Sequence, residues 1–198
     1  MDKLIDDLIK LAFAEDIGDG DHTTLCCIPE TAMGKSQLII KEDGVLAGVE
    51  MAKRIFHDFD PELKMTVFIQ DGAEVKKGDI AFVVEGKIQS LLQTERLMLN
   101  VMQRMSGIAT TTRKYAKALE GTKTHVLDTR KTTPGMRMID SGDTFHRFPQ
   151  KTLNFHCRIS PERIGDSDMR NSRITNILHI KSSLQIKIDR RKIRHLRH

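Results

Sequence analysis

The densest group of side chains that could bind a ligand or take part in a reaction lies in the segment DTRKTTPG, residues 128–135. It places an acid, two cations and three hydroxyls in a loop that follows a short apolar strand pattern. Arg130 offers a planar fork that suits a carboxylate or a phosphate, and Lys131 offers a movable point charge. The alternative is a solvated turn with an incidental ion pair. The residue types therefore predict either an anion-binding loop or an ordinary surface turn.

A second candidate is Arg96, which lies on the polar face of a predicted helix over residues 88–105. A solvated surface position is the default interpretation of such an arginine. Asn100 and Gln103 share its face, however, and a polar stripe of this kind can also line a contact between subunits. Arg104 is interpreted as a solvated surface residue.

Two further groups are interpreted as structural. The segment GDGDHTT, which includes His22, can be a metal or acid–base cluster, but a capped loop is the favoured interpretation. Cys26 and Cys27 have no recognisable base nearby, so we expect them to be small buried side chains. Together with the distant Cys157 they make neither a disulfide framework nor a CxxC metal motif. No metal ligand and no catalytic residue is assigned from these groups.

The composition excludes a disordered chain and a membrane protein. Of the 198 residues, 39% are hydrophobic and 30% are charged, which is enough apolar material for a packed core. No apolar run approaches the roughly 18 residues that a membrane helix requires, and the acidic start MDKLIDDLIK is unlike a signal peptide. We expect a soluble, cytoplasmic protein.

The net charge of +5 is unevenly distributed. Residues 1–138 hold 19 Lys and Arg against 21 Asp and Glu, a net of −2, whereas residues 139–198 hold 13 against 6, a net of +7. The second part has no Ala and no Val, and it prefers Arg to Lys by 9 to 4. Such a shift indicates either a basic tail that binds a polyanion or a change of reading frame.

Hydrophobic periodicity predicts the elements that must position the candidate residues. An amphipathic helix over residues 2–14 precedes a strand-rich region, 36–86, with a helical insertion within 45–59. The helix over 88–105 has an apolar stripe, and a second helix follows it and stops at Gly121. A strand then leads into the DTRKTTPG loop. The pattern predicts a small α+β domain followed by the opening of an α/β unit.

Five segments occur in sequence over about residues 1–138: EDIGDGDHTT, DGVLAGVE, DGAEVKKGD, ERLMLNVMQRMSGIATTTRKY and GTKTHVLDTRKTTPGMR. In this order and spacing they resemble the quinolinate phosphoribosyltransferase family, the carboxylating nicotinate-nucleotide pyrophosphorylases. The combination of ER, LN and SGIAT with DTRKTTPG is highly specific for that family.

The resemblance implies the α/β fold class. It implies an amino-terminal α/β sandwich domain over residues 1–106, followed by the start of a truncated α/β barrel whose first helix and strand occupy residues 107–138. Residues 139–198 remain as a basic tail outside the family pattern, which we expect to be poorly packed. The resemblance also implies a homodimer in which each site borrows residues from the partner copy.

The family's reaction joins quinolinate to phosphoribosyl pyrophosphate with Mg²⁺, giving nicotinate mononucleotide, pyrophosphate and CO₂ in NAD biosynthesis. By motif, Arg130 and Lys131, with Thr129 beside them, match the family's substrate-binding residues. Arg96 matches the arginine that reaches across the dimer into the neighbouring site. The resemblance thus implies a phosphoribosyltransferase, a glycosyltransferase that acts on a dicarboxylate.

The resemblance ends within MRMID, residues 136–140. The family continues with a Lys-Tyr/Trp-Ala-Val segment, a triple-glycine turn with Asn-His-Arg, and later acidic and phosphate-binding segments, none of which is present here. His146 and Arg147 lack the preceding glycines and are not given that role.

Because this break in the family pattern coincides with the compositional shift, we predict a frameshift near residues 138–140 and impaired activity. A genuinely divergent ending is the alternative, and reading the DNA around codons 136–142 in all three frames separates the two.

Two other functions remain open. In one, residues 1–138 are a retained fold and the basic end IDRRKIRHLRH binds a polyanion. Nucleic acid is the less favoured partner, because the tail has no recognised nucleic-acid motif and few aromatic side chains for base stacking. In the other, the chain derives from a related phosphoribosyltransferase that acts on a substrate other than quinolinate.

Overall fold

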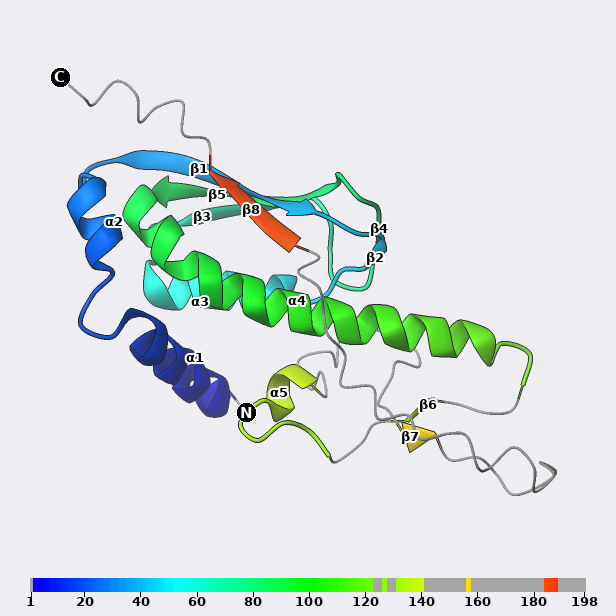
Figure 1. Cartoon of the computed structure of the whole chain (residues 1–198). Helices are drawn as coiled ribbons and strands as arrows, with labels where there is room; N and C mark the ends of the chain where they lie inside the picture. The colour runs from blue at the N-terminus through cyan, green and yellow to red at the C-terminus, as the bar shows by residue number, and fades with distance from the viewer. Residues whose placement is uncertain (1, 123–125, 128–130, 141–155, 158–183, 189–198) are drawn as a thin grey trace.

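The computed structural model describes residues 2–122, 126–127, 131–140, 156–157 and 184–188. Within these residues an antiparallel sheet of four strands has helices on one side, and the longest helix extends well beyond the sheet (Figure 1). The described residues therefore form a mixed α/β structure.

The sheet has the strand order β3-β5-β1-β8. Its central pair joins β1 (Met33–Ile40) to β5 (Ile80–Lys87), with Met33 opposite Lys87. Strand β3 (Lys64–Val67) pairs with the other side of β5, and β8 (Leu184–Ile188) pairs with the free edge of β1. Two short pairs lie outside this sheet: β2 (Gly44–Val45) with β4 (Glu74–Val75), and β6 (Val126–Leu127) with β7 (His156–Cys157).

Five helices accompany the strands in the described part of the chain. They are α1 (Asp2–Ile17), α2 (His22–Cys27), α3 (Val49–Phe59), α4 (Ile88–Ala118) and α5 (Arg137–Asp140). Helices α3 and α4 cover one face of the sheet, and α1 and α5 lie on the far side of α4 from it (Figure 1). None of the described helices combines the length and the apolar character that crossing a bilayer requires.

The core lies between the sheet and helix α4. The predicted apolar stripe of the helix is confirmed, with Met98 and Met102 fully buried and Met105 nearly so. Helix α3 adds Phe56, whose ring meets that of Phe82 on β5 edge to face, with centroids 6.3 Å apart. The alternating buried residues of β1 and β5 complete this core, as a sheet with one covered face requires.

Several sequence-based expectations change in the structure. The two helices predicted on either side of residue 106 are one continuous helix of 31 residues, because SGIAT contains no residue that must end a helix. The prediction that Cys26 and Cys27 are buried is wrong: both are exposed, because the short helix α2 buries only Thr24. Residues 184–188, which the sequence left without a predicted element, form strand β8 on the edge of β1.

Helix α3 begins at a loop contact that local sequence does not reveal. Gly48 precedes the helix at φ +100°, and a Cβ there would lie 3.0 Å from Sδ of Met105. The cap is supplied by Asp71, whose carboxylate accepts the backbone N–H groups of Val49 at 2.7 Å and Glu50 at 3.2 Å. Burial raises the pKa of Asp71 above its ordinary value of 3.8, and the hydrogen bonds from the helix oppose that shift without cancelling it.

This cap predicts a specific pH dependence of stability. Because the folded protein holds the Asp71 proton more tightly than the unfolded chain does, the free energy of unfolding falls as the pH rises from 3.8 through the raised pKa. Asp71→Asn keeps a cap acceptor but removes the titration, so urea unfolding at several pH values should show a smaller fall in that window. Glu74→Gln, at a side chain that is 76% exposed, is the matched control and should keep the wild-type pH profile. Equal profiles for Asp71→Asn and wild type would refute this account.

Candidate functional site

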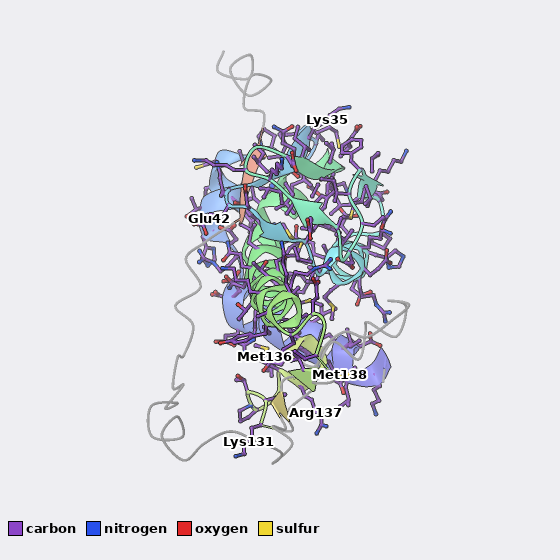
Figure 2. The ribbon with its side chains drawn as sticks, turned by 90° about the vertical axis from the view of Figure 1, so that its right-hand side faces the viewer. Lys35, Glu42, Lys131, Met136, Arg137 and Met138 are labelled. Carbon is purple, nitrogen blue, oxygen red and sulfur yellow. The ribbon has the colours of Figure 1, made fainter. Side chains whose placement is uncertain are left out.

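The predicted substrate-binding residues fall at the border of the described chain. Thr129 and Arg130 lie outside the described residues. Lys131 begins the next described segment and is exposed. In Figure 2 it lies near the lower edge, at the opposite end of the molecule from Lys35 on β1.

Arg96 projects from helix α4 with 72% of its side chain exposed, and its Nε lies 2.9 Å from Oδ1 of Asp16. Asp16 belongs to the last turn of α1, so this ion pair ties the EDIGDGD motif to the helix that carries Arg96. The pair is open to solvent on the arginine side, and such pairs contribute little to folding. Arg96 therefore keeps a guanidinium that a second ligand or a second copy can reach.

Arg104 is not the solvated surface residue that the sequence led us to expect. It forms a two-pronged pair with Asp140, from Nε to Oδ1 at 2.5 Å and from Nη2 to Oδ2 at 3.0 Å. Nη2 also donates to the hydroxyl of Thr133 at 2.7 Å, and the backbone N–H of Thr133 donates to Oδ2 of Asp140 at 3.0 Å. These contacts join α4 to a segment about 30 residues further along the chain.

Burial and hydrogen bonding have opposite effects on this network. Burial alone raises the pKa of Asp140, but the hydrogen bonds from Arg104 and from the Thr133 N–H outweigh it and leave the pKa below 3.8. The same pair raises the pKa of Arg104 above its ordinary value. Asp140 is therefore ionised at neutral pH and is committed to a structural pair, so it is unsuited to act as a general base.

The apolar residues next to Asp140 anchor the same segment. Met138 and Ile139 join the main core cluster, with Ile139 only 2% exposed. Figure 2 shows Met136 and Met138 beneath α4, with Arg137 further out and Lys131 beyond it. Residues 131–140 thus form a loop followed by α5, with Met138 and Ile139 buried at one end and Lys131 exposed at the other.

The GDGDHTT motif is a capped loop, as predicted. Asp21 caps α2 by accepting the backbone N–H of Thr24 at 3.1 Å and its hydroxyl at 2.5 Å, and the Thr24 contacts lower the pKa of Asp21. Among the described residues, no three His, Cys, Asp or Glu side chains are grouped closely enough to hold a metal ion. The Mg²⁺ that the resemblance implies is therefore not assigned ligands in this part of the chain.

Hydrogen bonds join two other motif segments, SGIATTT on α4 and VLAGV before α3. Ser106 accepts the backbone N–H of Ala47 at 3.0 Å and donates to its carbonyl, also at 3.0 Å. One turn further along α4, Thr110 accepts the N–H of Val45 at 2.9 Å. The hydroxyls of SGIATTT thus bind the backbone of VLAGV, which would otherwise leave polar groups unpaired against the core.

Arg96 and Arg104 of helix α4 have different surroundings. Helix α4 carries Arg96 and Arg104 eight residues apart, about 12 Å along the helix axis. One of these arginines fixes the segment of Lys131, and the other is exposed. The sequence pattern proposed Arg96 and Lys131 as site residues, and it interpreted Arg104 as a solvated surface residue although Arg104 lies in the motif segment QRMSGIAT.

Comparison with known proteins identifies both parts of this structure. Residues 21–106 match the domain described as "Quinolinate phosphoribosyl transferase, N-terminal domain", and residues 108–143 match its C-terminal domain. The chain is 46% identical over 134 residues to quinolinate phosphoribosyltransferase [decarboxylating] 1 of Nicotiana glauca, which covers 67% of this chain and 38% of that protein. It is 45% identical to the chloroplastic nicotinate-nucleotide pyrophosphorylase [carboxylating] of Oryza sativa, covering 67% of this chain and 36% of that protein.

Solved structures agree with these sequence matches. NadC from Streptococcus pyogenes aligns with a TM-score of 0.68 and 37% identity, covering 71% of this chain and 50% of that one. The nicotinate-nucleotide pyrophosphorylase from Francisella tularensis aligns with a TM-score of 0.66 and 32% identity, covering 71% and 49%. The chain thus spans about half of these structures and less than half of the curated relatives.

The geometry of Arg96 predicts that Asp16 is dispensable for folding. Asp16→Asn should change the free energy of unfolding by no more than about 1 kcal/mol, because the ion pair that it breaks is largely solvated. Ile9→Ala, on the same helix and 4% exposed, is the positive control and should cost about 2–5 kcal/mol in urea unfolding. A loss of more than 2 kcal/mol for Asp16→Asn would mean that Arg96 is a locked structural residue.

Proposed function

The chain belongs to the quinolinate phosphoribosyltransferase family, and we propose that it binds quinolinate through Thr129, Arg130 and Lys131, with Arg96 supplied by a second copy. The observation that carries this proposal is the unbroken family match across residues 108–143, which includes the DTRKTTPG segment with all three residues. The reaction that these residues would serve converts quinolinate and phosphoribosyl pyrophosphate to nicotinate mononucleotide, pyrophosphate and CO₂.

The chemistry of the ligand supports this assignment. Quinolinate carries two carboxylates on neighbouring ring carbons, so its binding requires more than one cation in one place. A guanidinium binds a carboxylate through two parallel hydrogen bonds, and an ammonium adds a second, adjustable charge. Arg130 and Lys131 are adjacent in the chain and supply one group of each kind.

A homodimer completes the proposed site. The Arg96 guanidinium is 72% exposed and its partner within the chain is a surface carboxylate, so a neighbouring copy can recruit it at small cost. A third cation at the dicarboxylate would strengthen binding of the ligand. Phosphoribosyl pyrophosphate brings Mg²⁺ with it as a complex, and no step of this proposal assigns that ion to the described residues.

We further propose that this chain binds substrate without turning it over. The match to the family stops at residue 143, and residues 139–198 lack the His-Arg pair, the lysine strand and the phosphate-binding segments that the family uses on the polyphosphate. Without those groups the charge of the transition state has too few partners. Release of pyrophosphate or CO₂ at an ordinary enzymatic rate by residues 1–198 would overturn this part of the proposal.

The central prediction concerns Arg130. Arg130→Ala should remove about 1.5–3 kcal/mol of binding energy, because it deletes a charge-assisted fork, and quinolinate affinity measured by calorimetry should fall at least tenfold. Lys114→Ala, which removes an exposed cation on α4 outside the proposed site, is the control and should bind as the wild type does. Unchanged affinity in Arg130→Ala would contradict the assignment.

A further inference from the structure

We propose that Arg104 and Asp140 form a latch that positions Lys131 for its anionic substrate, an inference that rests on the function proposed above. The latch comprises Arg104, Asp140 and Thr133. Its members come from α4, from α5 and from the loop between Lys131 and α5. At least 7 positions in sequence separate these three side chains from one another, and their hydrogen bonds bring them together.

Both carboxylate oxygens of Asp140 accept hydrogen bonds in the latch. Oδ1 of Asp140 accepts from Nε of Arg104, and Oδ2 accepts from both Nη2 of Arg104 and the backbone N–H of Thr133. The Asp140 side chain is only 11% exposed and that of Arg104 is 36% exposed, so water competes weakly for these bonds. This differs from the Arg96–Asp16 pair, in which the arginine is 72% exposed.

The short stretch of chain between Thr133 and Lys131 limits where Lys131 can lie when the latch is formed. Thr133 is held at both its hydroxyl and its backbone N–H, and Lys131 precedes it by two residues. Two residues span at most about 7 Å, so fixing Thr133 confines the Cα of Lys131 to a small region beside α4. Met138 and Ile139 hold the other end of the segment in the core.

The latch also neutralises an acid in the segment that carries Lys131. Asp140 is the acid at the end of the same loop, and its carboxylate is neutralised by Arg104. Without Arg104 this acid would be an uncompensated negative charge within the loop, which would disfavour an anionic ligand. Arg104 is therefore a positioning residue that acts through Thr133 and Asp140, and it does not itself touch the substrate.

The test uses the full chain with three single variants, the Arg104→Gln/Asp140→Asn double variant and one control variant. Arg104→Gln and Asp140→Asn break the fork at nearly constant size, and Arg104→Lys keeps the charge without the fork. Arg113→Gln is the matched control, since Arg113 lies on the same helix, is 54% exposed and contacts Glu74 at 3.8 Å. Three quantities are measured: hydrogen exchange of the Thr133 amide, labelling of the Lys131 amine by an amine-specific reagent, and quinolinate affinity.

In Arg104→Gln and Asp140→Asn we expect faster exchange at Thr133, changed labelling of Lys131 and about a tenfold or greater loss of quinolinate affinity. The double variant should be no worse than either single variant, because both delete one interaction. Arg104→Lys should recover part of the affinity, and Arg113→Gln should resemble the wild type in all three measurements.

The outcomes separate the latch from the proposed function. Unchanged Thr133 exchange, or faster exchange with unchanged Lys131 labelling, overturns the latch whatever the chain binds. Altered exchange and labelling with unchanged quinolinate affinity overturns its role in positioning. If the wild type binds no quinolinate, the proposed function fails, and exchange and labelling alone then decide whether the latch exists.

Discussion

The packing of one long helix against the sheet determines the rest of this structure. Burial of Met98, Met102 and Met105 fixes the rotation of α4 about its axis, because only one face of the helix can carry the apolar stripe. Every other side chain of the helix then has a defined direction. Arg96 is thereby exposed toward α1, and Arg104 meets Asp140. The core and the candidate site are consequences of the same constraint.

The polar residues of α4 extend this constraint to neighbouring segments. Ser106 and Thr110 bind the backbone before α3, and Arg104 binds the segment that begins at Lys131. The bonds of Ser106 and Thr110 are buried or partly buried, so their backbone partners would be costly to leave unpaired. The helix thus acts as the common support of the amino-terminal sheet and of the segment that begins at Lys131, the cation proposed to bind substrate.

Periodicity predicted the main elements because it reports burial directly. Strands β1, β3 and β5, the insertion that became α3 and the apolar face of α4 were all expected on that basis. Long-range pairing has no comparable local signal. Asp71 caps a helix 22 residues earlier in the chain, and Asp140 pairs with an arginine 36 residues earlier. Strand β8 was missed for the same reason, since its partner is β1.

The central claim is that two copies of the chain share each quinolinate site, with Arg96 from one and Arg130 from the other. Mixing the Arg96→Ala and Arg130→Ala variants tests it most directly, because a mixed dimer of a shared site contains one site with both substitutions and one with neither. If subunits exchange at random, half of the dimers are mixed, so about one quarter of all sites should regain wild-type affinity in calorimetry. Binding no stronger than that of either variant alone would contradict the account.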